Sequence, residues 1–281
     1  MRTLTYLTRS ARALLLLPLW AGQHATAQAA PGAGGPSIAL ADSTSVPMEV
    51  PEGRAIVAVL LNGRGPYRLA VETGSPDVLV SPRVVVDLAL RAIGPGETDS
   101  LFHLDSLRIG QALVRSLPVG RDSAFARLGI DGVLGLIAYR EVVLTIDYPN
   151  ERLSLARASL PEPDGREVLR AVRVGPFIGI PVELGGVRET GVIDTQGGIG
   201  FQATPEVAGH LTFQGPLRVV GRAVVGGGAP VEVKMGADIP SHVTIGTRVL
   251  HNFSVPIDQR SMSVRLTRPD SGAGRLTPSS S

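Results

Sequence analysis

The amino-acid sequence predicts a mostly β protein made of two similar lobes with a cleft between them. Three observations support this prediction. The composition favours short strands and turns, apolar runs alternate with turn signals, and one arrangement of strands and acidic residues occurs twice. The chain has 281 residues, of which 43% are hydrophobic, so a sizeable core is expected.

The composition contains many turn formers and few aromatic residues. There are 34 Gly and 22 Pro, but only 4% of the residues are aromatic. Gly and Pro interrupt regular structure at short intervals, which is typical of many short strands joined by turns. The absence of Cys excludes disulfides, thiolate metal sites and a lipid-modified N-terminal Cys.

Residues 1–29 have the layout of a secretory signal peptide. A basic head is followed by the apolar run Ala13 to Ala21 and by the small-x-small site Ala27-Gln28-Ala29. The apolar run is much shorter than the ~20 residues that span a bilayer. We therefore expect a secreted or periplasmic protein with no membrane span after the leader is removed.

Charge gives no indication of a nucleic-acid partner. The chain has 27 Lys+Arg and 25 Asp+Glu. The leader contains three of the Arg and none of the acids, which leaves 24 basic against 25 acidic residues. A nearly neutral mature chain lacks the basic surface that nucleic acids or anionic membranes attract.

The repeated unit begins with a hairpin that ends in an acid. In the first copy, the alternating stretch Ile56 to Leu61 precedes an Asn62-Gly63 turn and a strand that leads into Glu72. Asn-Gly between apolar runs is a strong hairpin signal. In the second copy, a stretch from Ile178 to Leu184 and a Gly-Gly turn precede a strand that leads into Asp194.

The later part of each copy also matches. Gly135 precedes a strand that ends at Asp147, and Gly246 precedes a strand that ends at Asp258, with the same spacing in both. The two Asp are interpreted as turn starters rather than functional groups. The predicted organisation is a flexible lead-in (30–46), a first lobe (47–158), a linker (159–169), a second lobe (170–268) and a disordered tail (269–281). Each acid strand is expected to precede a short helix, with Ser81 capping the first at Pro82 to Leu90.

The two acids at the strand ends are the candidate catalytic residues. A carboxylate directly after apolar strand residues is costly to bury unless it is paired or hydrogen-bonded. Loops from two similar lobes can meet at a pseudo-twofold axis, where Glu72 and Asp194 would share one proton. The ionised partner could then take a proton from water while the other binds a substrate carbonyl.

The acid loops, together with Gly129 to Gly135, resemble the retropepsin-like and pepsin-like aspartic proteases, notably the bacterial secreted members. The resemblance implies an aspartic-type endopeptidase that cuts extended peptide or protein substrates without a cofactor or metal. It implies that a monomer suffices, because both acids lie in one chain. It also implies that Glu72 and Asp194 form the catalytic pair.

The same resemblance assigns supporting roles in the two loops. Thr73 and Thr195 would brace the loops through hydroxyl bonds between lobes, and the Gly74 N–H would approach a carboxylate. Ser75 and Gln196 would complete the loop support. The sequence departs from the family twice: Glu72 stands where the family has Asp, and Gln196 where it has Gly.

A flexible hairpin over the cleft is a further expectation from the resemblance. Gly226, Gly227 and Gly228 would form its tip, although an ordinary surface hairpin is the slightly favoured interpretation of the same residues. Two other functions stay open. One is an inactive two-lobed protein that binds peptides or a protein partner in the cell envelope, and the other is a structural β protein of the envelope. The few His show no metal-binding spacing, so no metal is expected.

Overall fold

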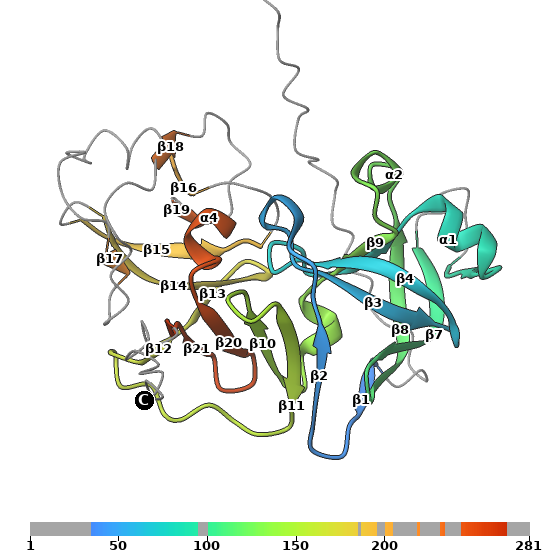
Figure 1. Cartoon of the computed structure of the whole chain (residues 1–281), viewed down its shortest axis with the longest axis horizontal. Coiled ribbons are helices and arrows are strands. Elements are labelled where there is room, and N and C mark those ends of the chain that lie inside the picture. The colour runs from blue at the N-terminus through green and yellow to red at the C-terminus, as the bar shows by residue number, and fades with distance from the viewer. Residues whose placement is uncertain are drawn as a thin grey trace, which may run out of the picture.

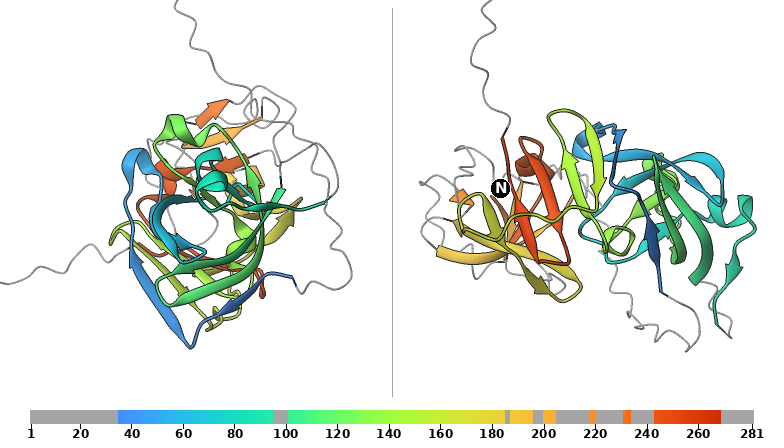
Figure 2. Two further views of the ribbon diagram at one scale, coloured as in Figure 1. Left: turned by 90° about the vertical axis from the view of Figure 1, so that its right-hand side faces the viewer. Right: turned by 90° about the horizontal axis from the view of Figure 1, so that it is seen from below.

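The computed structural model describes residues 35–94, 101–184, 187–195, 200–204, 218–219, 231–233 and 243–268. Within these residues the chain is mostly strand and forms three sheets. Two lobes lie side by side along the long axis, and a sheet with strands from both halves of the chain lies between them (Figure 1). The view from below shows the same separation (Figure 2). The fold is therefore mostly β and two-lobed, as the sequence predicts.

The first lobe is built on an eight-stranded sheet with the order β1-β8-β5-β9-β4-β3-β7-β6. Its strands are β1 (Ser37–Ala39), β3 (Ile56–Leu61), β4 (Arg64–Val71), β5 (Val78–Val80), β6 (Arg91–Ala92), β7 (Leu101–Ile109), β8 (Ala112–Arg121) and β9 (Gly132–Leu134). Short helical segments connect them: η1 (Pro51–Gly53), α1 (Pro82–Asp87), α2 (Phe125–Leu128) and η2 (Leu136–Tyr139).

The second lobe contains the sheet β13-β14-β15-β19-β16-β18, with β17 paired to β14. Its elements are β13 (Val172–Val174), β14 (Phe177–Leu184), β15 (Val187–Ile193), β16 (Phe201–Ala203), β17 (Arg218–Val219), β18 (Val231–Val233), β19 (Val243–Ile245) and the helix α4 (Thr247–Leu250). In both lobes the strand that ends at an acid has a parallel neighbour, β9 beside β4 and β19 beside β15.

The ends of the two copies form one shared sheet with the order β12-β21-β20-β10-β11-β2. Its strands are β2 (Ser43–Pro47), β10 (Val143–Asp147), β11 (Arg152–Ala156), β12 (Val168–Arg170), β20 (Ser254–Asp258) and β21 (Ser263–Arg265). The offset that relates Asp147 to Asp258 also relates Thr145 to Pro256, and these two residues pair directly between β10 and β20. An antiparallel pair of equivalent residues marks the pseudo-twofold axis that relates the two copies.

The part of the lead-in that is described is ordered, which corrects the expectation of a flexible 30–46 segment. β1 pairs with β8 of the first lobe, and β2 pairs with β11 of the shared sheet. Ile38 and Leu40 are buried at 6% and 7% exposure. The small, polar composition of this segment gives no strand signal, because its strands are formed by pairing with β8 and β11, which lie far along the chain.

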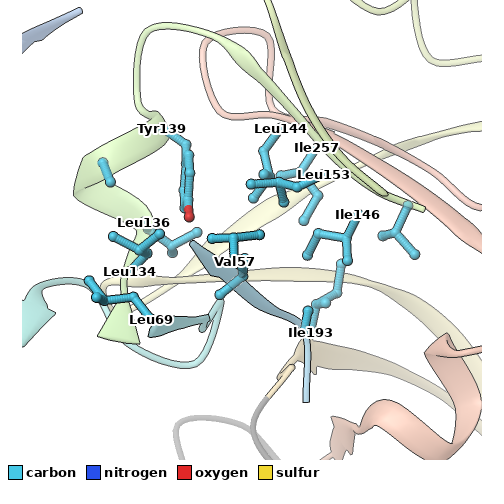
Figure 3. Close-up of a cluster of buried hydrophobic side chains, with 14 of the residues drawn as sticks. Val57, Leu69, Leu134, Leu136, Tyr139, Leu144, Ile146, Leu153, Ile193 and Ile257 are labelled. Carbon is cyan, nitrogen blue, oxygen red and sulfur yellow. The ribbon is translucent and has the colours of Figure 1, made fainter. Parts of the chain in front are cut away.

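A single hydrophobic cluster continues from the first lobe through the shared sheet into the second lobe. Figure 3 shows Ile146 of β10 close to Ile193 of β15, with Leu144 beside Ile257 of β20. These side chains are 0% to 1% exposed. Full burial of such a side chain contributes about 1.5–3 kcal/mol, so the lobes are held against the shared sheet by packing.

The local signals of the first lobe behave as expected. Asn62 and Gly63 adopt positive φ of 48° and 73° in the turn between β3 and β4, as a tight hairpin turn requires. The Ser81 hydroxyl accepts a hydrogen bond from the Val84 N–H and caps α1. The helix ends before the expected Leu90, because Ala89 has φ of 48° and leaves the helical region. Among the described residues, no helix is both long and apolar enough to cross a membrane.

Candidate active site

Glu72 and Asp194 occupy equivalent positions in the two lobes. Each follows directly after a strand, β4 for Glu72 and β15 for Asp194. The Glu72 N–H donates to the Leu134 carbonyl at 3.0 Å, and the Asp194 N–H donates to the Ile245 carbonyl at 2.9 Å. The same main-chain bond to the parallel neighbour strand therefore fixes the backbone of both acids at the end of a buried strand.

Hydrogen bonds between the lobes join the two acid loops. The Thr195 hydroxyl accepts from the Thr73 N–H at 3.0 Å and donates to the Val71 carbonyl at 2.7 Å. The Thr73 hydroxyl donates to the Ile193 carbonyl at 2.7 Å. Both Thr are 1% exposed, so losing a partner would leave a buried polar group unpaired. These bonds hold the residues just before and after each acid in register across the pseudo-twofold axis.

Gly74 brings the second acid against the first loop. A Cβ built on Gly74 would lie 2.8 Å from Asp194 Oδ1 and 2.9 Å from its Cγ. Real Cβ atoms do not approach a carboxyl group so closely, so only Gly allows this contact without a shift. The Asp194 carboxyl group therefore lies over the backbone only two residues beyond Glu72.

The environment of Glu72 favours its neutral form. The side chain is 8% exposed. Burial, and then the negative charges of Asp194 and Asp122, raise the pKa of Glu72 from 4.5 to about 8, while the positive charge of Arg54 acts in the opposite direction. Glu72 thus keeps its proton at neutral pH.

The loop that carries Glu72 packs against the segment directly after β9. The Ser75 carbonyl accepts from the Leu136 N–H at 2.9 Å, and the Ser75 hydroxyl donates to the Asp77 carbonyl at 2.9 Å. Gly135 packs so tightly on the Ser75 and Asp77 carbonyls that a side chain there would overlap them. The loop that carries Glu72 is therefore held on both sides.

The structure brings together five of the residues singled out from the sequence: Glu72, Thr73, Gly74, Asp194 and Thr195. Ser75 lies in the same loop, with its hydroxyl bonded within the loop. Gln196 and the Gly226, Gly227 and Gly228 segment lie outside the described residues, as do the leader 1–29 and the tail 269–281.

Sequence reasoning missed three charged or polar groups near the acids. Arg54 and Asp122 both act on Glu72. The buried Tyr148 lies within electrostatic reach of Asp194, and burial followed by that charge raises the pKa of its phenol. For Arg54 the hairpin pattern gave only an approximate signal. It sets the residues just before β3 near the end of β4, but it does not decide which of them faces Glu72. Asp122 directly follows β8 and Tyr148 follows β10, and no local pattern connects them with the acids.

Other acids have structural partners. Asp131 accepts from the Arg68 N–H at 2.9 Å and is paired with Arg83. Asp258 is paired with Arg260 at 3.0 Å. No group of three or more His, Asp or Glu side chains within the described ranges converges as a metal site would.

Comparisons with known proteins give a likeness of fold. No family model matches the chain, and no curated protein matches it. The solved aspartic proteinase from Irpex lacteus aligns with a TM-score of 0.54 and 12% identity, covering 81% of this chain and 98% of that one. A retropepsin-like aspartic protease from Rickettsia conorii aligns with a TM-score of 0.31 and 14% identity, covering 46% of this chain and 98% of that one. At such identities the first likeness concerns the fold alone.

Proposed function

We propose that this chain, which has the aspartic-protease-like fold of two β lobes, is an aspartic-type endopeptidase that uses Glu72 and Asp194. The observation that carries the proposal is the meeting of the two acid loops. Hydrogen bonds made by Thr73 and Thr195 join the two loops, and the Asp194 carboxyl group lies over Gly74. Bringing a buried carboxyl group, that of Glu72, close to the half-buried one of Asp194 is costly, and a structural role alone gives no reason for it.

The two acids have different tasks in the proposed reaction. Glu72, whose pKa is raised to about 8, holds the shared proton and donates a hydrogen bond to the carbonyl oxygen of the scissile peptide. Asp194 is ionised and takes a proton from a water molecule, whose oxygen attacks the carbonyl carbon. The tetrahedral intermediate then loses the amine, which takes the proton from Asp194 as the C–N bond breaks.

The substitution of Glu for Asp in the first loop is compatible with this mechanism. Glu is one methylene longer, so its carboxyl group is displaced by about a bond length. A displacement near 1 Å can cost about 100-fold in rate when nothing compensates for it. In this protein the longer side chain is buried and held in its neutral form, which is the form needed to bind a carbonyl.

The substrate class follows from the proposed chemistry. An extended peptide between the lobes would present its carbonyl to both acids at once, and one chain would act as a monomer. Export through the 1–29 leader, to the periplasm or the exterior, is part of the same proposal. Under it the enzyme needs no cofactor.

The test is cleavage of a mixed peptide library by the purified mature chain at pH 4 to 8. We expect the wild type and the control Asp87→Asn, which neutralises an exposed acid on α1, to cut the same bonds. Asp194→Asn should lower cleavage at least about 100-fold, because it removes the general base. Equal background in all three proteins would reject the endopeptidase. Peptide binding without cleavage would then favour the inactive binding protein.

A further inference from the structure

Arg54 faces Glu72 across the β3–β4 hairpin. The register of this hairpin pairs Ile56 with Ala70 and Val57 with Leu69. Extending it by two residues places Arg54 opposite Glu72. Side chains of directly opposite residues lie on the same face of a sheet, with Cβ atoms about 4.5–5.5 Å apart.

The backbone bonds show that the ladder continues to this pair. The Val71 N–H donates to the Ala55 carbonyl at 2.7 Å, which makes these two residues a hydrogen-bonded pair. The next pair, Arg54 and Glu72, is then a non-hydrogen-bonded pair, in which the Cα atoms are about 4.5 Å apart and the side chains are closest. Accordingly, Arg54 is extended at φ −79° and ψ 126°, and the Glu72 N–H points away to Leu134.

The surroundings of Arg54 keep its charge near the acids. Its guanidinium contacts Glu52 at 3.1 Å, and its side chain is 23% exposed whereas that of Glu52 is 79% exposed. Its Nε is buried without a hydrogen-bond partner. On the adjoining residue, a Cβ built on Gly53 would lie 2.7 Å from Thr247 Oγ1 of α4. The backbone next to Arg54 is thus packed against the second lobe.

The charges around Glu72 are unequal. Asp194, from the second lobe, and Asp122, after β8, both disfavour its ionised form, as does burial. Arg54, which lies between η1 and β3, is a positive charge that opposes them. Its own partner Glu52 is largely exposed, so solvent screens that charge more than the one facing Glu72.

We propose that Arg54 is a positioning residue of the acid pair, whose positive charge holds the Glu72 carboxyl group on the shared face of the hairpin and stabilises its ionised form. Its part in catalysis rests on the proposed endopeptidase function. Its electrostatic effect on Glu72 does not, and can be measured in a protein that cuts nothing.

The experiment is an NMR titration of the full mature chain with ¹³C-labelled Glu carboxyl groups, in which Glu72→Gln identifies the Glu72 signal. We expect Arg54→Gln to raise the Glu72 titration midpoint by about one pH unit, since an opposite charge at this range is removed. Arg54→Lys, which keeps the charge, should restore most of the wild-type midpoint. Arg68→Gln is the matched control, because Arg68 lies on the same hairpin and pairs with Glu49 instead.

The outcomes separate the two proposals. An unchanged midpoint in Arg54→Gln, an equal shift in Arg54→Lys, or an equal shift in Arg68→Gln would each overturn the role of the Arg54 charge. A shift limited to Arg54→Gln supports it, whether or not the protein hydrolyses peptides. In an active enzyme, the alkaline limb of the kcat/KM profile should move in the same direction and by the same amount as the NMR midpoint.

Discussion

Replacing Glu72 with Gln should remove a large part of the pH dependence of folding stability. In the unfolded chain Glu72 releases its proton near pH 4.5, whereas in the folded chain its pKa is about 8. Between these values the folded state binds a proton that the unfolded state has lost. The free energy of unfolding therefore falls as the pH rises from 4.5 to about 8. Below pH 4.5 both states are protonated and the full stability is present.

The size of the effect follows from the span between the two pKa values. Each pH unit corresponds to about 1.4 kcal/mol, so complete titration of Glu72 costs roughly 4–5 kcal/mol of stability. A typical domain has a total stability of about 5–15 kcal/mol, so the loss is easy to measure. Gln has nearly the same shape as protonated Glu and cannot ionise, so Glu72→Gln should lack this component.

The assay is urea unfolding at equilibrium, followed by circular dichroism at pH 5, 6, 7, 8 and 9 for both proteins. Subtracting the Glu72→Gln curve from the wild-type curve cancels the other titrating groups. Asp258 and Asp164, whose pKa values are lowered, destabilise the fold only as the pH falls through their own range. Parallel curves for the two proteins would show that Glu72 is not held neutral, and the assignment of the shared proton would be wrong.

Two further predictions concern the contacts between the lobes. Gly74→Ala should lower kcat/KM by about 100-fold with little change in Tm, because the new Cβ displaces the Asp194 carboxyl group. The control is Gly35→Ala, whose Cβ meets nothing closer than 3.9 Å and which should leave activity unchanged. Full activity in Gly74→Ala would refute the contact. Thr195→Val removes two buried hydrogen bonds and should lower the free energy of unfolding by about 2–4 kcal/mol in urea. The partly exposed Thr145→Val should change it by less than about 0.5 kcal/mol, and equal effects would contradict the bracing role of Thr195.

The sequence by itself determined the features that depend on local pattern. The Asn62-Gly63 turn, the apolar strands before Glu72 and Asp194, and the capped start of α1 at Ser81 are each written in a few adjacent residues. Turn chemistry, strand alternation and helix capping act over that range, so these elements could be predicted without knowing their neighbours. The duplication was also visible, because equal spacings between Gly and Asp recur in both copies.

Only the tertiary structure decided which distant residues meet. The hairpin shows this for Arg54. Counting from the turn, where Leu61 pairs with Arg64, would place Gly53 opposite Glu72, but a register shift between Val59 and Leu61 brings Arg54 there instead. A shift of one residue turns a side chain to the other face of the sheet, so the neighbour of the acid depends on that irregularity.

The pairing of the shared sheet and the ordering of 37–47 were hidden for a related reason. Strands pair through main-chain hydrogen bonds, as β2 does with β11, and almost any residue can make these bonds. The pattern of side chains in the sequence therefore indicates which face of a strand is buried, but it does not indicate which strand lies beside it. Local periodicity therefore predicts strands and their buried faces, whereas long-range packing chooses the neighbours that make a site.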